Sequence, residues 1–309
     1  LVNINPAYRT AEVEYALNKV DCKALVTMPR FKTSDYIGML RELAPEWAHA
    51  KAGEPLESQT LPHLKHAIWI DVAGEGADEP GFMRFSDLIQ RGDPADERVA
   101  RIARLLHPRD PINVQFTSGT TGFPKGATLT HRNILNNGFF IGEAMKLTHE
   151  DRLCIPVPLY HCFGMVLGNL AVLTHGGCIV YPNDGFDPLT VLQTVQDERC
   201  TGLHGVPTMF IAELDHPRFA EFNLSTLRTG IMAGSPCPTE VMKRVVEQMN
   251  LREITIAYGM TETSPVSCQS STDTPLDKRV STVGLVQPHL EIKIIDPETG
   301  RTVPVGEGG

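Results

Sequence analysis

The chain has 309 residues, which corresponds to about two domains and is enough to bury a sizeable core. Its hydrophobic fraction of 41% and charged fraction of 21% are ordinary for a folded protein and exclude a disordered, collagen-like or coiled-coil chain. Lysine and arginine total 28 against 37 acidic residues, a net charge of −9. That is the wrong sign for a protein whose partner is nucleic acid or anionic lipid, so a polyanion must be held locally.

The seven cysteines are an odd number without a C-x-x-C pair, which signals neither a disulfide framework nor a zinc site. We predict a reducing compartment, the cytoplasm or, in a eukaryote, the mitochondrial matrix. The longest apolar stretch, 163–173, is shorter than the ~20 residues that a membrane span needs. The chain starts at Leu1 and stops at Gly309 within a run typical of a connection, so we expect a fragment of a longer protein.

Patterns of helix and strand alternate through the first half of the chain. Thr10 can cap a helix whose apolar residues Val13, Leu17 and Val20 fall at helical spacing. Residues 24–28 form a short apolar run typical of a buried strand. Further helices are predicted at 35–43 and 96–106, further strands at 67–72 and 112–116, and surface loops at 53–62 and 74–81.

The alternation continues in the second half, where Thr130 caps a helix that runs to about Lys146. Helices are then predicted at 164–174, 188–198 and 239–249, and strands at 152–157, 177–181, 203–206, 227–233 and 254–258. This order predicts an α/β fold with mainly parallel sheets in layers, divided into subdomains at 1–148 and 149–275. Apolar and polar residues alternate over 290–296, which predicts a half-exposed antiparallel strand and then a turn at 296–300. Residues 276–309 would thus begin a small β-barrel subdomain.

Residues 117–126 place four hydroxyls, three glycines and Lys125 directly after a predicted strand. Glycines let backbone N–H groups approach an anion closely, hydroxyls add donors, and a lysine supplies a cation, so this loop suits phosphate. It is not a Walker A loop, because Lys125 follows Pro124 and precedes Gly126. The alternative is a Ser/Thr/Gly linker.

Two more polar segments follow predicted strands, at 258–262 (Tyr-Gly-Met-Thr-Glu) and at 233–238 (Ala-Gly-Ser-Pro-Cys-Pro). The carboxyl edge of a parallel sheet is where α/β proteins bind ligands. Thr261 could donate a hydrogen bond to a phosphate, and Glu262 could hold Mg²⁺ through oxygen. Taken alone, either segment is compatible with an ordinary structural turn or helix start.

In this order, the three segments resemble motifs of the adenylate-forming superfamily, which includes acyl-CoA ligases, coumarate-CoA ligases, luciferases and peptide-synthetase adenylation domains. Residues 117–126 are similar to its phosphate loop, 258–262 to its YGxTE motif and 205–208 to its GVPT segment. The opening residues and Pro-Leu-Tyr-His-Cys-Phe at 158–163 look most like fatty-acyl-CoA ligases. The resemblance covers essentially the whole chain and implies an N-terminal catalytic core.

The resemblance implies ATP, Mg²⁺ and coenzyme A as cofactor and co-substrates. Thr261 would contact the α-phosphate and Glu262 the Mg²⁺, both as catalytic residues together with His161. Tyr258 and the turn at Gly234 and Ser235 would flank adenine. The ATP-binding residues implied in this way are Thr117, Ser118, Gly119, Thr120, Thr121, Gly122, Lys125, Gly234, Ser235, Pro236, Tyr258, Gly259, Met260 and Thr261.

Amino-acid-activating members of the superfamily carry an aspartate where this chain has 160–163, Tyr-His-Cys-Phe. Because an unpaired ammonium in an apolar pocket is costly, we expect a substrate without one. His161 would lie near the substrate carboxylate, and the alternative is a hydrogen-bonded core histidine. The acyl pocket would be lined by His161, Phe163, Gly205 and Val206, with the glycine leaving room for a chain. Cys162 is interpreted as a small apolar filler.

The implied reaction is ATP-dependent activation of a fatty acid to an acyl-adenylate, followed by thioester formation with coenzyme A. An adenylation domain that loads a carrier protein, an aryl- or coumarate-type CoA ligase and a non-enzymatic binding protein remain as alternatives, as does a homodimer. Relatives also carry a ribose-binding aspartate and a C-terminal domain with a catalytic lysine, and nothing in this chain matches them. We therefore expect the 309-residue chain not to turn over by itself.

Overall fold

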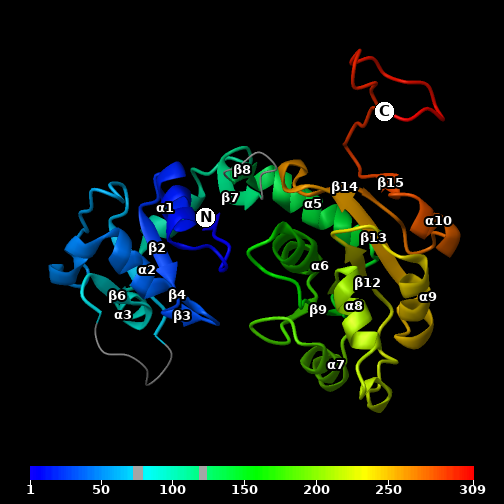
Figure 1. Cartoon of the computed structure of the whole chain (residues 1–309), viewed down its shortest axis with the longest axis horizontal. Helices are drawn as coiled ribbons and strands as arrows, with labels where there is room; N and C mark the ends of the chain where they lie inside the picture. The colour runs from blue at the N-terminus through cyan, green and yellow to red at the C-terminus, as the bar shows by residue number, and fades with distance from the viewer. Residues whose placement is uncertain (72–78, 118–123) are drawn as a thin grey trace. The chain divides into compact units, whose positions relative to one another are not determined.

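The computed structural model describes residues 1–71, 79–117 and 124–309, which form two compact units, Leu1–Thr128 and Leu129–Gly309 (Figure 1). The boundary between the two units thus follows Thr128, whereas the sequence predicts it after residue 148. The reason is that helix α5 (His131–Ala144) packs against the η2 and α6 segments of the second unit. The separation of a third part at 276–309 stays a prediction.

The first unit is built around small sheets. Strands β2 (Ala24–Thr27), β5 (His66–Trp69) and β6 (Phe82–Arg84) form a parallel sheet in that order. A second sheet has the order β1–β7–β8, and β3 and β4 form a hairpin. The remaining elements of this unit are β1 (Val2–Asn3), α1 (Thr10–Lys19), β3 (Arg30–Phe31), β4 (Ser34–Asp35), α2 (Tyr36–Leu43), η1 (Pro45–His49), α3 (Phe85–Gln90), α4 (Glu97–Ala103), β7 (Pro111–Thr117) and β8 (Lys125–Thr130).

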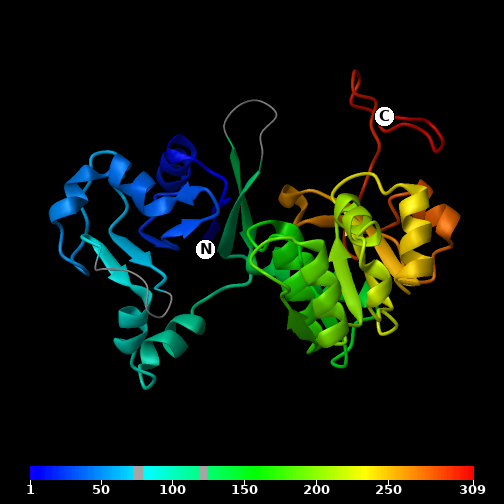
Figure 2. The ribbon, with the colours of Figure 1, turned by 60° about the horizontal axis from the view of Figure 1, so that its bottom comes forward.

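The second unit contains a seven-stranded sheet of order β10–β9–β11–β12–β13–β14–β15 (Figures 1 and 2). The first five strands are parallel, and β14 and β15 are added antiparallel. All residues of β11 and β12 are buried, as expected for parallel strands covered on both faces. The strands are β9 (Arg152–Cys154), β10 (Cys178–Val180), β11 (Gly202–Gly205), β12 (Thr229–Ala233), β13 (Glu253–Gly259), β14 (Val266–Gln269) and β15 (Leu285–Val286).

Two groups of helices pack with this sheet. In one group α5 contacts η2 and α6, and in the other α8 contacts both α7 and α9. The second group shares its main hydrophobic core with β9, β11, β12 and β13 through residues such as Leu192, Phe210 and Met242. The helical elements are η2 (Phe163–Leu170), α6 (Ala171–His175), α7 (Pro188–Asp197), α8 (Pro207–Leu214), η3 (Phe219–Glu221), α9 (Thr239–Gln248), η4 (Thr261–Thr263) and α10 (Leu276–Ser281).

The predicted α/β class with parallel sheets is confirmed, and three local predictions are wrong. Thr10 does not cap α1: the cap is Arg9, whose backbone N–H donates to Glu12, while the Thr10 hydroxyl donates to Glu42. Strand β2 is only partly buried because it is an edge strand of its sheet.

The third correction concerns the C-terminal end, whereas the longest apolar stretch is helical as predicted. The helix predicted at 164–174 is confirmed, as a π-helix from Phe163 to Leu170 that continues directly into α6. No helix of the described residues has the length and apolar character to cross a bilayer. Within the described residues 290–309, pairing is limited to one antiparallel bridge between Ile295 and Thr302, so 290–296 is not a strand. The turn at 296–300 is confirmed, since the Gly300 N–H donates to the Asp296 carbonyl at 2.9 Å.

An ionic network ties together the amino-terminal ends of the parallel strands. The carboxylate of Asp151 accepts from Arg228 Nη2 at 2.7 Å, from the Thr201 hydroxyl at 2.7 Å and from the Thr148 N–H at 2.8 Å. Arg228 also binds Glu253 at 2.6 Å. Burial raises the pKa of Asp151, but the hydrogen bonds from Arg228 and Thr201 outweigh burial and hold that pKa below its ordinary value. The network fixes the register at one end of the sheet, and so aligns the opposite, carboxyl edge.

We expect Asp151→Ala to lower the free energy of unfolding by about 2–3 kcal/mol, because it leaves Arg228 and two further donors without their shared acceptor. The expected value lies below that of a fully buried pair, since the Arg228 side chain is 31% exposed and still binds Glu253. Urea denaturation, monitored by circular dichroism, measures this change in the free energy of unfolding. Glu198→Ala, which breaks the more exposed pair with Arg152, is the control and should cost less than about 1 kcal/mol. Equal effects of the two variants would contradict this assignment.

Candidate functional site

The predicted site residues of the second unit lie at one edge of its sheet. Strands β9, β11, β12 and β13 are parallel neighbours, so the segments that leave their carboxyl ends emerge on the same side. The polar residues of these connecting segments therefore lie at the carboxyl edge of the sheet. This edge is the usual ligand site of an open α/β sheet. The segments carry His161 and Cys162 after β9, Val206 after β11, Gly234 and Ser235 after β12, and Met260, Thr261 and Glu262 after β13.

The segment after β13 is held in a fixed shape by close backbone contacts. The β13–β14 pairing shifts register between Tyr258 and Gly259. A Cβ on Gly259 would lie 1.9 Å from the Pro265 carbonyl oxygen, so only glycine fits there. The Thr263 hydroxyl donates to the Pro265 carbonyl at 2.6 Å. Tyr258 is half exposed, as a side chain that contacts a ligand requires.

Thr261 meets the segment that follows β9. Its hydroxyl lies 3.6 Å from the Sγ atom of Cys162, and both side chains are buried, at 8% and 5% exposure. Burial raises the pKa of the Cys162 thiol, so the thiol stays protonated. Cys162 thus packs and makes a hydrogen-bonding contact with Thr261. This contact brings two predicted site segments together, and Glu262, the next residue, is exposed.

His161 is exposed, so it is not the core histidine that was the alternative. Its Nδ1 accepts from the Phe163 N–H at 3.1 Å, which assigns the ring proton to Nε2 when the ring is neutral. The protein around the ring partly desolvates it and lowers the pKa of His161. A neutral imidazole with an Nε2–H donor can hydrogen bond to a carboxylate oxygen.

A second histidine, His204 in β11, was not among the predicted site residues. It is fully buried, and its Nε2 donates to the Leu167 carbonyl in η2 at 2.9 Å while its Nδ1 accepts from the Ile231 N–H at 3.1 Å. Burial lowers the pKa of His204 to about 4. The ring lies 5.5 Å from that of the buried Phe163. A histidine within an apolar strand and next to Gly205 was the signal available in the sequence.

Gly205, which the sequence places in the wall of the acyl pocket, lies against a core side chain. A Cβ there would lie 2.9 Å from the ring of Phe210, so glycine at this position makes room for Phe210 in the core, and its role in an acyl pocket stays a prediction. Val206 is half-buried, and a Cβ on Gly234 would lie 3.1 Å from its Cγ1 atom. Gly234 has φ +91°, a left-handed conformation that favours glycine. Ser235 and Pro236, which follow, are exposed.

The predicted phosphate loop belongs to the first unit. Thr117 ends β7, and Lys125, which is exposed, begins the neighbouring strand β8. The Tyr15 hydroxyl donates to the Pro124 carbonyl at 3.1 Å and so fixes the start of β8 to α1. The loop residues Ser118, Gly119, Thr120, Thr121 and Gly122 lie outside the described residues.

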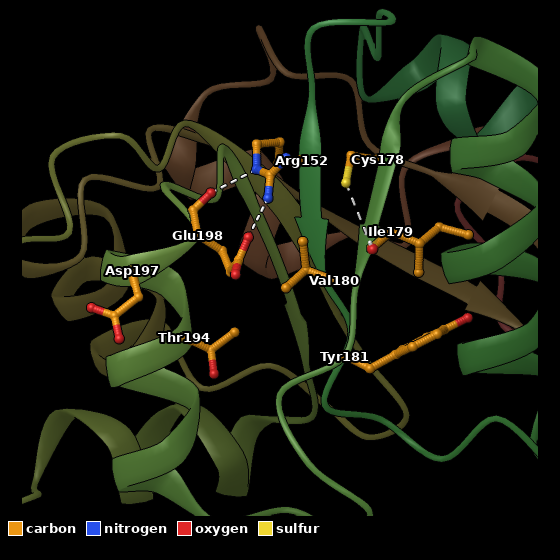
Figure 3. A pocket seen from close by; sticks show the side chains of 8 residues that line it. All are labelled: Arg152, Cys178, Ile179, Val180, Tyr181, Thr194, Asp197 and Glu198. Carbon is orange, nitrogen blue, oxygen red and sulfur yellow. Dashed lines mark hydrogen bonds and ion pairs between the residues drawn. The ribbon is translucent and has the colours of Figure 1, made fainter.

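A hollow of about 410 Å³ lies elsewhere, beside the edge strand β10 and helix α7 (Figure 3). Its lining includes Arg152, Tyr181 and Glu198, and Arg152 Nε donates to the Glu198 carbonyl at 2.6 Å across it. Arg152 and Glu198 pair with each other there, and the hollow holds no predicted site residue, so it is not the candidate site.

Comparison with known proteins gives a family match over the whole chain. Residues 1–309 match the family described as AMP-binding enzyme. The medium-chain acyl-CoA ligase ACSF2, mitochondrial, of Danio rerio is 43% identical over 100% of this chain and 50% of its own length. Acyl-CoA ligase sidI of Aspergillus fumigatus is 44% identical, with the same coverage. The chain therefore spans about half the length of these curated relatives.

Solved structures support the fold. The anthranilate CoA ligase AuaEII in complex with anthranoyl-AMP superposes with a TM-score of 0.80 at 24% identity, over 99% of this chain and 53% of its own. A long-chain-fatty-acid-CoA ligase (FadD1) from Archaeoglobus fulgidus gives a TM-score of 0.75 at 22% identity, over 99% of this chain and 56% of its own. At these identities, the likeness is one of fold.

Proposed function

Because the chain belongs to the AMP-binding enzyme family, we propose that it is the nucleotide- and acid-binding part of an acyl-CoA synthetase. The longer protein activates a fatty acid with ATP to an acyl-adenylate and pyrophosphate, and then transfers the acyl group to coenzyme A. The names of the curated relatives, among them a medium-chain acyl-CoA ligase and an acyl-CoA ligase, support this reaction class.

The observation that carries the proposal is the 3.6 Å contact between Cys162 and Thr261. It sets His161, which can hydrogen bond to a carboxylate, beside the segment that carries Thr261 and Glu262. Adenylation needs this arrangement, because a carboxylate must be held in line with the α-phosphate while the negative charge of the phosphates is neutralised.

At the nucleotide end, Thr261 donates to the α-phosphate, and Tyr258 and Gly234 flank the adenine. Lys125 and Thr117 are proposed to contact the β- and γ-phosphates. Glu262 is exposed, and among the described residues no three His, Cys, Asp or Glu side chains gather into a metal site. A single carboxylate suits Mg²⁺, which takes its remaining ligands from substrate phosphates and water. Bound there, Mg²⁺ would supply charge neutralisation on the phosphates.

At the acid end, the neutral His161 donates from Nε2 to the substrate carboxylate and orients it. The acyl chain would extend along Phe163 and Val206, in an apolar environment without an acidic side chain at 160–163 to bind an ammonium. This favours a fatty acid over an amino acid. Coenzyme A and Mg²⁺ are part of this proposal, as are a homodimer and a cytoplasmic or mitochondrial location.

Two other reactions use the same first step. An adenylation domain would transfer the acyl group to a carrier protein, and an aryl- or coumarate-type ligase would take a planar acid. The structure of AuaEII, an anthranilate CoA ligase in complex with anthranoyl-AMP, has the same fold. The fold alone therefore does not distinguish an aryl acid from a fatty acid.

We expect the full-length protein to exchange labelled pyrophosphate into ATP in the presence of medium- or long-chain fatty acids, and to form acyl-CoA when coenzyme A is added. A panel of fatty, aryl and amino acids tests the substrate class. Exchange with amino acids alone would overturn the proposal, and so would its absence with every acid. The 309-residue chain is the control, and we expect it not to support exchange at the full-length rate.

A further inference from the structure

The side chain of Asn137, in helix α5, binds the backbone of β14 at a single residue. Its Nδ2 donates to the Val266 carbonyl at 2.8 Å, and its Oδ1 accepts from the Val266 N–H at 3.0 Å. Asn137 is 8% exposed and Val266 2%, so water does not compete for these bonds. Helix α5 packs against β14 (Figure 1), and Val266 begins this strand soon after Thr261 and Glu262. The contact therefore lies next to the segment proposed to bind the α-phosphate and Mg²⁺.

The peptide group that joins Pro265 to Val266 is held from both sides. Its N–H is the one that donates to Asn137. Its carbonyl oxygen accepts from the Met260 N–H at 3.1 Å and from the Thr263 hydroxyl at 2.6 Å. Because a peptide group is planar, a bond that fixes its N–H also fixes the direction of its carbonyl. Hydrogen bonds on the two sides of one peptide group also polarise and strengthen each other.

Thr261 and Glu262 lie between the two residues that bind this carbonyl, since Met260 precedes them and Thr263 follows them. The end of β13 packs against the same oxygen, because a Cβ on Gly259 would lie 1.9 Å from it. A shift of this carbonyl must therefore move the backbone on both sides of Thr261 and Glu262.

Helix α5 is itself fixed against the helix that follows His161. A Cβ on Gly138 would lie 2.7 Å from the Leu170 Cβ in η2, so the absence of a side chain lets α5 and η2 pack closely. The helix η2 begins at Phe163, shortly after His161. Asn137 and Gly138 are neighbours in α5, so one turn of this helix contacts both the segment after β9 and the segment after β13.

We propose that Asn137 is a positioning residue for acyl activation, an inference that rests on the proposed function. Its two polar atoms both bind Val266, so it acts on the backbone and not on a substrate. By fixing the peptide group at 265–266, it holds Thr261 and Glu262 in place relative to the segment that carries His161. An amide suits this role because it offers a donor and an acceptor, whereas a carboxylate of the same shape has no donor for the Val266 carbonyl.

The test is Asn137→Ala in the full-length protein, which removes both bonds to Val266. We expect kcat for pyrophosphate exchange to fall about 10- to 100-fold, because small displacements of reacting groups cost that much. The Mg²⁺ concentration for half-maximal rate should rise, whereas KM for the fatty acid, which binds at the other end of the site, should change less than about twofold. Hydrogen exchange provides a readout that does not need the reaction: the amides of Met260 and Val266 should lose protection.

Asn250→Gly is the matched control. The Asn250 amide also makes two bonds to the backbone, to the carbonyls of Ser225 at 3.1 Å and Leu227 at 2.7 Å. Glycine suits its φ of +60°. These residues lie before β12 and β13 begin, at the opposite edge of the sheet from the candidate site. We expect this variant to lose thermal stability while kcat, the Mg²⁺ dependence and the amide protection of 258–266 stay at the wild-type values.

Thr263→Val, at a half-buried position, releases the same carbonyl from its other side and provides the test if Asn137→Ala does not fold. It should lower kcat and raise the Mg²⁺ requirement in the same way. Because both changes act through one peptide group, the double variant should lose less than the product of the two single losses, whereas the losses of Thr263→Val and Asn250→Gly should multiply.

Equal kcat in Asn137→Ala and Asn250→Gly, with unchanged amide protection at 258–266, would overturn the proposal. Losses that multiply in the double variant of Asn137 and Thr263 would overturn it as well. If wild-type protein exchanges pyrophosphate with no acid, it is the proposed function that fails. The amide protection of Met260 and Val266 still decides in that case whether Asn137 fixes this segment.

Discussion

Replacement of Glu262 by glutamine in the full-length protein is expected to lower kcat/KM for ATP-dependent acyl activation about 100-fold or more. The carboxylate is exposed and directly follows Thr261, which is fixed by its contact with Cys162. Glutamine keeps the shape and removes the charge, so the metal bound to the phosphates would lose its protein ligand. Loss of one electrostatic contact to the developing charge costs about 3–4 kcal/mol of barrier.

Two readouts separate this role from a structural one. The Mg²⁺ concentration for half-maximal rate should rise in Glu262→Gln, and the midpoint of thermal unfolding should stay at the wild-type value. Glu247→Gln, at an exposed position of α9, is the matched control and should leave both the rate and the Mg²⁺ dependence unchanged. If Glu262→Gln behaved like this control, the assignment of Glu262 to the metal would be wrong.

The fold was predictable where local chemistry agrees with the final structure. Thr130 accepts from the Asn133 N–H at 3.2 Å and caps α5, as the sequence indicated. Asp187 caps α7 in the same way, and Pro188 begins it. The apolar run of β12 is buried on both faces, which is the signature of a parallel strand between two helical layers. In each case residues close in sequence contain the information.

Strand β14 was not predicted, because its stability depends on partners far away in the chain. It carries the buried polar residue Gln269, whose amide nitrogen donates to the Thr255 hydroxyl at 3.1 Å and whose oxygen accepts from Gln287 at 2.8 Å. The Asn137 side chain in α5 pairs with both backbone groups of Val266, at 2.8 and 3.0 Å. A polar residue is expected at the surface until its partners are known.

In the candidate site, too, local patterns were predictable and long-range contacts were not. The rule that parallel strands share a carboxyl edge was enough to group the segments that carry Gly234 and Thr261, whereas His161 was assigned only through the resemblance to adenylate-forming enzymes. The rule did not reveal that Cys162 and Thr261, 99 positions apart, touch, nor that Phe210 fills the space beside Gly205. These contacts depend on side-chain packing between elements, which periodicity does not encode. His204 was missed for the same reason, since its two hydrogen-bond partners lie 37 and 27 residues away.

Acidification should destabilise the second unit through His204. Burial lowers the pKa of this imidazole from 6.5 to about 4, so the unfolded chain takes up a proton at a higher pH than the folded one. The stability contributed by the neutral ring is complete above about pH 6.5 and falls as the pH drops toward 4, by about 3 kcal/mol over that interval. The sign follows because the unfolded state binds more protons throughout it.

His204→Gln isolates this contribution, since glutamine does not titrate while its amide can still donate or accept. At pH 7 the variant should be less stable than wild type, because one of the Leu167 carbonyl and the Ile231 N–H loses its partner. As the pH falls to about 4.5, the wild type loses stability that the variant keeps, and the difference between them should shrink by about 2–3 kcal/mol. Urea denaturation at a series of pH values measures both curves.

The control is His149→Gln, at an exposed position of the same unit, whose curve should run parallel to that of wild type. Parallel curves for His204→Gln would mean that the buried ring does not hold its neutral form in the folded protein. Because the same ring packs beside Phe163 and binds the η2 carbonyl of Leu167, its protonation would also disturb the proposed acyl pocket. Loss of fatty-acid activation below about pH 5 should therefore follow the loss of stability in wild type and be weaker in the glutamine variant.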